Sequence, residues 1–449
     1  MTLPLRDATH DPKRTSWVAS ANGHAQFPVQ NLPLGVYAPP AGPPRIGVAI
    51  GAAVLDLAAC AVADLLPAAA QDAACQDTLN AIFALPARER QALRHSISAL
   101  LSDLSYREMV EPLLTPAADC TMHLPARIGD YTDFYVGIHH AEAVGRLFRP
   151  QNPLLPNYKH LPIGYHGRAS SVRVSGEPVI RPRGLVLPAG ADVPTYAPTA
   201  RLDHEVELAL WVGPGNAPGQ PIPIAEAAQH VVGVGLLNDW SARDIQAFEY
   251  QPLGPFLGKS FHTSVSPWVV TLEALAPFLT AQTPRPEGDP APPPHLHDEE
   301  DARRGALALT LEANLTSERM RRHGDVPLRL SRASAGAMYW TMAQMIAHHT
   351  SNGCDLRPGD LLGTGTISGP DEGGCGSLLE MTRGGIDLLT LPSGETRAFL
   401  EDGDEVVLSA RAQAPGAVPI GLGECRARVL PAFDAQGSAG TRQGASSPV

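Results

Sequence analysis

The chain has 449 residues, with 34 Lys and Arg against 46 Asp and Glu, so its formal charge is −12. This length predicts two or three domains, and 44% apolar with 18% charged residues predicts a packed core rather than general disorder. The negative charge argues against a nonspecific nucleic-acid binder. The 42 glycines and 44 prolines occur without a Gly-X-Y period, which excludes collagen and disfavours long helices.

The six cysteines are scattered and none forms a Cys-x-x-Cys pair, so we expect reduced thiols rather than a disulfide scaffold. The most apolar early run, residues 46–63, is interrupted by Asp56, and no stretch reaches the ~18 uncharged apolar residues of a membrane span. The first residues contain no apolar signal core. These features predict a soluble, cytoplasmic protein.

Residues 1–123 are expected to form an N-terminal domain with a small β part and some helix. The first 25 residues are polar and irregular, and are expected to be mobile. Apolar runs on both sides of Gly51 predict a β-hairpin. Further along, helical spacing predicts a helix that carries Leu93, Ile97, Leu100 and Leu101.

Residues 124–432 are expected to form a second domain that contains many short strands rather than βαβ units. The apolar runs that indicate these strands are broken by Gly and Pro, and lie at 171–174, 206–212, 231–237, 265–272 and 306–315. The Pro-rich and then acidic stretch 281–303 is expected to be an exposed insertion. Residues 334–349 carry the clearest helical pattern, and the low-complexity tail 433–449 is expected to be disordered.

Several familiar catalytic motifs are missing. The sequence contains no phosphate-binding loop, no complete dinucleotide fingerprint and no Gly-x-Ser-x-Gly nucleophile elbow. His204-Glu205 is not followed by the second histidine of a zinc protease. A serine or zinc hydrolase is therefore disfavoured.

Carboxylates stand close to apolar runs. Residues 201–212 predict a strand, and an ordinary strand with one wet face would explain the shared face of Asp203, Glu205 and Glu207. Asp239, however, follows a buried run, and Asp133 lies within an aromatic cluster. A buried carboxylate must be paired, protonated or bound to a cation. If these carboxylates converge, they form an all-oxygen site, which suits Ca²⁺ or Mg²⁺ better than zinc.

A polar helix is predicted after this acidic run. Residues 239–250 would be capped by Asn238 or Asp239, and the side chains that share one side of the helix would be Arg243, Gln246 and Tyr250. A solvated stripe is the simpler explanation, but a helix start beside Asp239 would also point N–H groups toward an anion. Lys259, in an apolar loop, is either a structural cation or a partner for an anionic substrate.

Histidines supply the candidate base. His139 and His140 follow the aromatic cluster, and histidine is the usual base near neutral pH. Taken singly, each could equally be a surface residue or a satisfied core residue. Glu380 ends an apolar run after a Gly-rich loop, and could orient a histidine as the second member of a dyad.

Five blocks of the chain resemble the fumarylacetoacetase family. They are IGDYTDFY (128–135), LPIGYHGRASSV (161–172), NDWSARDIQ (238–246), PLGPFLGKSF (252–261) and RPGDLLGTGTISGP (357–370). The resemblance extends from Phe27 to Leu430, and only the last block is shared with the wider fumarylacetoacetate hydrolase superfamily. It implies a mainly β (α+β) homodimer, with a small SH3-like β-barrel N-terminal domain followed by a mixed β-roll catalytic domain.

The resemblance also implies an activity. Members of the family hydrolyse a C–C bond of 4-fumarylacetoacetate to give fumarate and acetoacetate, the last step of tyrosine and phenylalanine catabolism, with Mg²⁺ and/or Ca²⁺ as cofactor. The implied metal ligands are Asp133, Glu205, Glu207 and Asp239, with Lys259 and Thr263 at additional cation-site positions. At position 262, between Lys259 and Thr263, this chain has His262 where the family usually has glycine.

The remaining site residues follow from the same matches. His140 corresponds to the base and Glu380 to the carboxylate that orients it. The groups around the developing oxyanion and leaving group correspond to Arg243, Gln246 and Lys259. The substrate contacts correspond to Tyr135, Arg149, Tyr165, Gln246, Tyr250 and Thr366.

Two alternatives remain. An acylpyruvate hydrolase or a β-keto acid decarboxylase of the same superfamily would share the metal carboxylates and block 357–370. A catalytically inactive binding or scaffold protein would lack a base or a metal ligand, and none is missing from the sequence.

Overall fold

Apolar alternation around Gly51 produces an antiparallel hairpin in the structure, a computed structural model that describes residues 3–433. β2 (Arg45–Ile50) pairs with β3 (Ala53–Asp56), and on its other side with β1 (Leu34–Ala38). Gly51 adopts a positive φ of +56° at the turn, a conformation that favours glycine. The predicted hairpin is confirmed.

Two short strands extend this small sheet without closing it. β4 (Leu114–Pro116) pairs with β3, and β5 (Thr121–His123) pairs with β1. Within residues 3–433 no pairing joins β4 to β5, and β1 continues instead into β17 (Trp268–Thr271) of a larger sheet. The described chain is therefore a mixed α/β, sheet-rich fold, while the SH3-like barrel and the domain boundary at residue 123 stay predictions.

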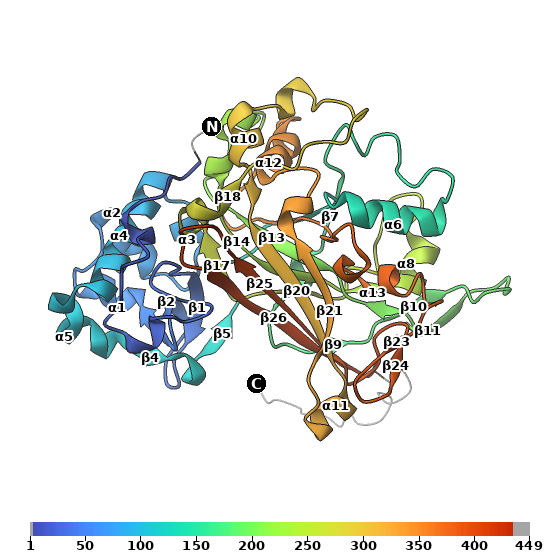
Figure 1. Ribbon diagram of the computed structural model, residues 1–449, viewed down its shortest axis with the longest axis horizontal. Helices are drawn as coiled ribbons and strands as arrows, with labels where there is room; N and C mark the ends of the chain where they lie inside the picture. The colour runs from blue at the N-terminus through green and yellow to red at the C-terminus, as the bar shows by residue number, and fades with distance from the viewer. Residues whose placement is uncertain (1–2, 434–449) are drawn as a thin grey trace, which may run out of the picture.

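Helices of the N-terminal part lie beside these strands, at the left of Figure 1. α4 (Ala87–Ser102) buries Leu93, Ile97, Leu100 and Leu101, as predicted. The other helices here are α1 (Leu57–Val62), α2 (Ala68–Ala74), α3 (Asn80–Phe83) and α5 (Arg107–Val110).

Residues 3–25 pack against α4 and α9 (Leu272–Leu275), although the sequence predicted a mobile start. Arg94 Nε of α4 donates to Thr9 Oγ1 at 3.0 Å, and His10 Nε2 lies 2.8 Å from the carbonyl oxygen of Glu273. Thr9 and His10 are both buried. Polar residues that looked unpartnered in the sequence are thus held by contacts from distant segments.

The large sheet carries the strands that matter for the site. Its main path has the order β4-β3-β2-β1-β17-β14-β13-β22-β6-β7, with β5, β8 and β16 attached beside it. The strands outside the N-terminal part are β6 (Tyr131–Phe134), β7 (Gly164–His166), β8 (Val172–Val174), β13 (Val206–Val212), β14 (Val231–Asp239), β16 (Thr263–Val265), β17 and β22 (Leu361–Gly363).

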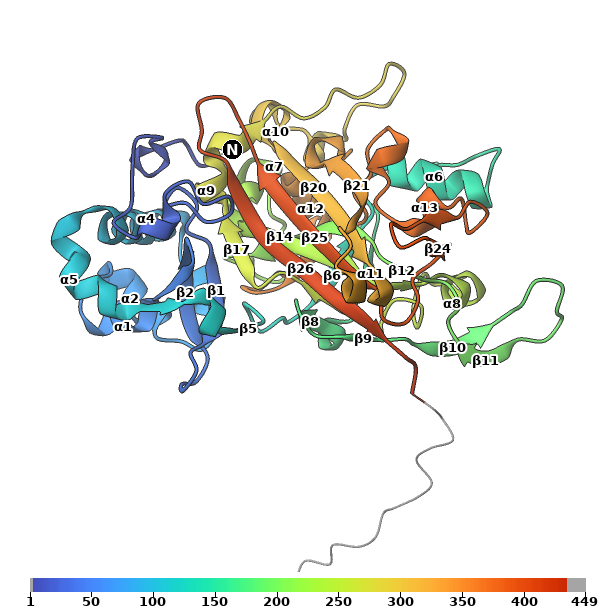
Figure 2. The ribbon, with the colours of Figure 1, turned by 60° about the horizontal axis from the view of Figure 1, so that its bottom comes forward.

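A second, five-stranded sheet packs against this one, as Figure 2 shows. Its order is β21 (Leu328–Ser334), β20 (Leu309–Thr316), β25 (Glu405–Ala412), β26 (Ile420–Leu430) and β9 (Val179–Ile180). Because side chains alternate along a strand, Leu208 and Leu210 of β13 enter the core shared with this sheet. Ala209 and Trp211 enter the core shared with the N-terminal strands.

The remaining elements connect or cover the sheets. The helices are α6 (Ile138–Phe148), α7 (Ile224–Ala227), α8 (Arg243–Glu249), α9 (Leu272–Leu275), α10 (Glu299–Arg304), α11 (Glu318–His323), α12 (Met342–Thr350) and α13 (Leu378–Met381). The short strands are β10 (Arg183–Val186), β11 (Thr195–Pro198), β12 (Leu202–Asp203), β15 (Ser241–Ala242), β18 (Leu279–Thr280), β19 (Ala306–Leu307), β23 (Leu389–Thr390) and β24 (Thr396–Arg397).

The helix predicted over 334–349 is wrong in its first half. Ser334 still belongs to β21, and α12 begins only at Met342. Thr341 Oγ1 accepts from the backbone N–H of Gln344, whose side-chain oxygen accepts from Thr341 N–H. This reciprocal capping box fixes the start of the helix, and between β21 and α12 only Ala335–Ala337 form a short 3-10 helix.

The stretch 281–303 is not simply an exposed insertion. Leu296 and Asp301 are buried, and the guanidinium of Arg285 lies 4.3 Å and 4.4 Å from the ring centres of Tyr339 and Trp340. The segment is rich in proline, but contacts such as that of Arg285 with Tyr339 and Trp340 hold it against the rest of the protein.

The remaining predictions concern the apolar run 265–272, the cysteines, membrane-spanning helices and the C-terminal tail. The run 265–272 is divided into β16 and β17 around Pro267, which has no N–H to donate. All six cysteines are free, as predicted. No helix within residues 3–433 is both long enough and apolar enough to cross a bilayer. Apart from Phe433, the tail predicted to be disordered lies outside the described residues.

Candidate active site

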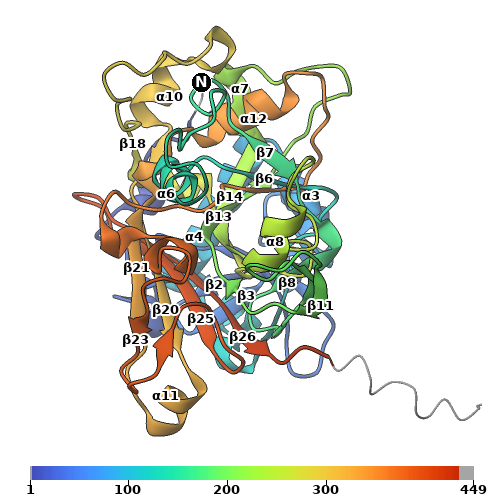
Figure 3. The same cartoon turned by 90° about the vertical axis from the view of Figure 1, so that its right-hand side faces the viewer.

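A cavity of about 410 Å³ opens where β6 and β7 meet α6 and α8. Figure 3 shows these two helices on the same side of the molecule. The sequence-predicted residues that line it are Asp133, Tyr135, His140, Arg149, Tyr165, Glu205, Arg243, Gln246, Tyr250, Lys259 and Thr366. Segments that are far apart in the sequence are therefore brought together.

Three carboxylates form a compact acidic cluster beside the cavity. Asp133 lies on β6, Glu207 on β13 and Asp239 at the end of β14, and one oxygen of each lies within 4.8 Å of the others. All three side chains are buried. Glycine at position 363, on the strand between β13 and β6, leaves the space open, because a Cβ there would clash with Asp133 Oδ1 and come within 3.0 Å of Glu207 Oε2.

The acidic cluster lacks enough positive partners. Gly365 N–H donates to Glu207 Oε2 at 2.9 Å and to Asp133 Oδ1 at 3.2 Å, but Glu207 Oε1 is buried without a hydrogen-bond partner. Burial, and then the neighbouring carboxylates, raise the pKa of Asp133 and of Glu207 well above the ordinary range. An all-oxygen donor set with an orphaned buried oxygen fits a hard divalent cation.

Glu205 lies next to this cluster but has protein cations of its own. Its Oε2 is 2.5 Å from Lys259 Nζ, and its Oε1 is 2.7 Å from Arg243 Nη2. Burial alone would raise the pKa of Glu205, but Lys259 and Arg243 outweigh it and hold that pKa well below its usual value. Lys259 also contacts Asp239. The role of Glu205 as a metal ligand stays a prediction, because it is outside the group of three converging oxygens.

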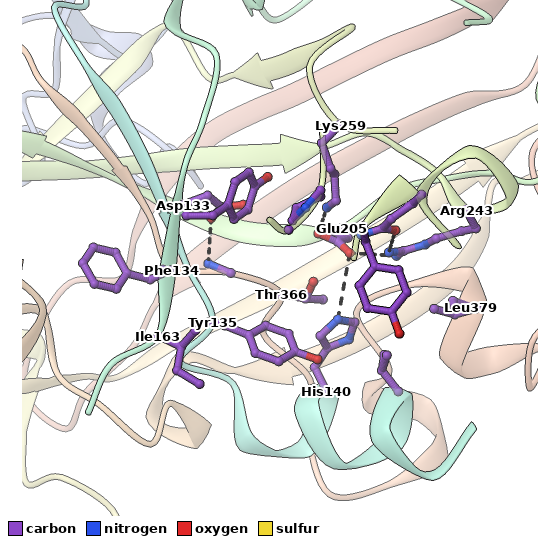
Figure 4. Close-up of a pocket in the computed structure, with 18 of the residues that line it drawn as sticks. Asp133, Phe134, Tyr135, His140, Ile163, Glu205, Arg243, Lys259, Thr366 and Leu379 are labelled. Carbon is purple, nitrogen blue, oxygen red and sulfur yellow. Dashed lines mark hydrogen bonds and ion pairs between the residues drawn. The ribbon is translucent and has the colours of Figure 1, made fainter. Parts of the chain in front are cut away.

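His140 and Glu380 form the dyad that the sequence suggested. His140 Nδ1 lies 2.7 Å from Glu380 Oε2. On the other side of the ring, His140 Nε2 lies 3.9 Å from Glu205 Oε1, a contact that Figure 4 marks with a dashed line. A carboxylate only accepts hydrogen bonds, so the Nδ1 proton is donated to Glu380 and Nε2 is left free toward the cavity. His139, the neighbouring candidate, does not line the cavity.

Two serines hold Glu380 in place, and sequence reasoning missed them. Ser368 Oγ and Ser377 Oγ donate to Glu380 Oε2 at 3.1 Å and 2.7 Å. Burial alone would raise the pKa of Glu380, but His140 and these hydroxyls outweigh it and lower that pKa. The only sequence signal was their position at the ends of the Gly-rich stretch that precedes Glu380.

The predicted polar face of α8 is confirmed, but the helix starts later than expected. Arg243, Gln246 and Tyr250 all line the cavity, and Arg243 Nη1 donates to Gln246 Oε1 at 3.2 Å. Asn238 and Asp239 do not cap the helix, because both belong to β14 and pair with β16. The backbone demands of the sheet therefore override the local capping signal.

The candidate substrate contacts also reach the cavity. Tyr165 donates from its hydroxyl to Asp239 Oδ2 at 3.1 Å, and the ring of Tyr135 meets that of His140 edge to face at 5.5 Å. Thr366 Oγ1 and Arg149 Nε are buried without hydrogen-bond partners. Such unsatisfied polar groups are costly unless a ligand completes them.

Two residues near position 260 do not reach the cavity. Thr263 pairs with Asp239 in the β14–β16 register, but does not line the cavity, so its cation role stays a prediction. His262 is buried against the Trp240 ring, and its Nε2 lies 3.1 Å from Ser264 Oγ.

Comparisons with known proteins show the family of this chain. The sequence model "Fumarylacetoacetate (FAA) hydrolase C-terminal" matches residues 131–430, and "Fumarylacetoacetase N-terminal" matches residues 30–125. Fumarylacetoacetase of Rattus norvegicus is 46% identical over 418 residues, that of Homo sapiens 47% over 419 and that of Caenorhabditis elegans 48% over 425. Each match covers 91% of this chain and 97% of the relative. The chain therefore belongs to the fumarylacetoacetase family.

Proposed function

We propose that the protein hydrolyses 4-fumarylacetoacetate to fumarate and acetoacetate, the last step of tyrosine and phenylalanine catabolism. One observation carries this proposal: His140, oriented by Glu380, directs its free Nε2 into the cavity that also borders an all-oxygen acidic cluster. The names of the relatives, which are 46–48% identical, support the choice of substrate. Binding alone would not require an oriented base.

The bond-breaking steps follow from the position of this base. His140 Nε2 takes a proton from a water, whose oxygen attacks the ketone carbon next to the fumaryl group. The ketone oxygen becomes an oxyanion as the new C–O bond forms. The C–C bond then breaks, its electron pair leaves with acetoacetate as an enolate, and His140 returns the proton to that carbon.

Positive and polar groups on the other side of the cavity would hold the developing charge. Arg243, Gln246 and Lys259 are the proposed donors to the oxyanion and to the leaving enolate, and all three line the cavity. One preorganised donor of this kind typically contributes about 3–4 kcal/mol to the lowering of the barrier. A flexible donor would first have to be ordered, at an entropic cost.

Substrate binding would use the remaining lining residues. Fumarylacetoacetate carries a carboxylate at each end, and Arg149, whose Nε lacks a partner, is suited to one of them. The further proposed contacts are Tyr135, Tyr165, Gln246, Tyr250 and Thr366, which also line the cavity.

The proposed cofactor is Mg²⁺ and/or Ca²⁺. Asp133, Glu207 and Asp239 would hold it, with Glu205 as a fourth ligand and with Lys259 and Thr263 at additional cation-site positions. The donor set contains only oxygen where the three carboxylates converge, which supports a hard cation. When bound, such a cation supplies Lewis acidity toward the oxygens of the diketone.

The assembly and location of the protein are also proposals. A homodimer is supported by exposed apolar side chains near the cavity, of which Leu253 is 96% and Phe256 65% exposed. A cytoplasmic location is supported by the six free cysteines. Light scattering would test the dimer. The family resemblance supports an SH3-like N-terminal barrel, with domains at 1–123 and 124–432.

Turnover of the purified protein tests the activity. With Mg²⁺ or Ca²⁺ present, we expect loss of the ultraviolet band of the diketone, with fumarate and acetoacetate formed in equal amounts. Release of CO₂ from a β-keto acid would indicate a decarboxylase instead. A higher kcat/KM for an acylpyruvate than for fumarylacetoacetate would replace the proposed substrate, and no cleavage of either would refute the activity.

A further inference from the structure

Asp203 is a fully buried carboxylate that does not line the cavity. It ends β12, which pairs with β15, the strand that leads directly into Arg243. Its Oδ2 accepts from Arg243 Nε at 2.8 Å and from Leu379 N–H at 3.0 Å. Its Oδ1 accepts from Leu378 N–H at 2.7 Å and from His204 N–H at 2.8 Å.

These contacts join two parts of the candidate active site. Arg243 is one proposed oxyanion donor, and Leu378 and Leu379 begin α13, which carries Glu380. Glu380 in turn holds His140. One carboxylate thus connects the donor on one side of the cavity to the dyad on the other, across segments that are distant in the sequence.

We propose that Asp203 is a positioning residue, which fixes the guanidinium of Arg243 relative to the His140–Glu380 dyad. It does not line the cavity and is not one of the three carboxylates of the acidic cluster, so it acts through other residues. The inference rests on the proposed function only for its kinetic consequence. A displacement of about 1 Å in a catalytic group can cost about 100-fold in rate.

Each oxygen of Asp203 accepts from at least two N–H groups, so a neutral side chain of the same shape cannot satisfy all of them. In Asp203→Asn the amide nitrogen must face two N–H groups, whichever way the side chain is turned. Arg243 or the start of α13 then has to move. The same Asp→Asn substitution in a buried Asp–Arg pair elsewhere in the protein would lower stability but leave the His140–Glu380 dyad undisturbed.

Asp404 supplies that matched control. It is also fully buried, and its carboxylate accepts from Arg397 Nε at 2.8 Å, from Arg397 Nη2 at 3.0 Å and from Glu401 N–H at 2.9 Å. Neither Asp404 nor Arg397 lines the cavity. Asp404→Asn therefore breaks the same kind of buried Asp–Arg pair without touching Arg243 or α13.

The test compares Asp203→Asn, Asp404→Asn and the unmodified protein loaded with Mg²⁺. For Asp203→Asn we expect kcat to fall about 100-fold, with KM within a few-fold and with the low-field proton resonance of His140 Nδ1–H shifted or lost. For Asp404→Asn we expect kcat and that resonance to be unchanged, with a comparable loss of stability. If Asp203→Asn does not fold, Asp203→Ser and Asp404→Ser replace the pair, because serine leaves room for a water among the donors.

The readouts separate this inference from the proposed activity. If the unmodified protein does not cleave fumarylacetoacetate, the activity fails, and the His140 resonance still decides the role of Asp203. If the unmodified protein is active, but Asp203→Asn lowers kcat no more than Asp404→Asn and keeps the resonance, Asp203 is only a structural residue.

Discussion

At the same cavity, the negative charge of the acidic cluster and that of its neighbour Glu205 are compensated in different ways. Within the described residues, Lys259 is the one protein cation that forms an ion pair with the acidic cluster of Asp133, Glu207 and Asp239, and in that cluster it pairs only with Asp239. Burial comes first among the causes that raise the pKa of all three. Glu205 is equally buried, yet its pKa is lowered, because it pairs with both Lys259 and Arg243.

The difference teaches that burial alone does not define a metal site. Carboxylates that already have arginine or lysine partners form a rigid, internally neutralised network, which can position groups for proton transfer and charge stabilisation. Carboxylates without such partners store an electrostatic cost that an external cation relieves. Asp239 and Lys259 lie where the two groups meet, so cation binding and the network are adjacent but chemically distinct.

The largest expected effect separates proton chemistry from cation binding. In His140→Ala we expect turnover to fall about 1,000-fold, because general base catalysis is lost, while the affinity for Mg²⁺ changes little. Steady-state kinetics and calorimetric titration measure the two quantities. His139→Ala is the control, and should retain turnover because His139 does not line the cavity. A decrease below tenfold in His140→Ala would rule out the base assignment.

Two neighbouring glutamates, Glu205 and Glu207, should contribute differently to the stability of the cation-free protein. Glu205→Gln leaves Lys259 and Arg243 poorly compensated, and we expect it to lower the free energy of unfolding by about 3 kcal/mol. Burial raises the pKa of Glu207 and so favours its neutral form without a cation, and Glu207→Gln replaces it with a neutral amide, so we expect no loss, or a gain. Urea denaturation with a chelator present measures both. Equal losses of unfolding free energy in the two variants would mean that Glu205 and the acidic cluster do not differ in charge compensation.

The smallest expected effect concerns the number of protons that are released when the cation binds. Burial and neighbouring carboxylates raise the pKa of Asp133 and of Glu207 without a cation, and both must bind one as carboxylates, so cation binding should release protons. Affinity should accordingly weaken as the pH falls. Calorimetry in buffers of different ionisation enthalpy measures the count. Glu207→Gln should reduce it, and Glu205→Gln should not, since Glu205 is already ionised. Binding without proton release would contradict the protonated state of the acidic cluster.

Local pattern alone determined a large part of what the structure shows. The hairpin at Gly51, the apolar face of α4 and the shared side of Arg243, Gln246 and Tyr250 follow from periodicity, since each depends on residues only a few positions apart. The resemblance added roles for the candidate site residues. Four of those candidates do not line the cavity: Glu207, Asp239, Thr263 and Glu380.

Tertiary structure decided what local pattern could not. Asn238 and Asp239 looked like helix caps but are used by the sheet, and residues 3–25 looked unpartnered but pack against α4. Which carboxylate pairs with a lysine or arginine, and which does not, depends on distances between strands that the sequence does not encode locally. Side-chain identity fixes the chemistry that each group can perform, but Coulomb energy and desolvation depend on three-dimensional neighbours. For that reason, only the folded protein separates Glu205 from Glu207.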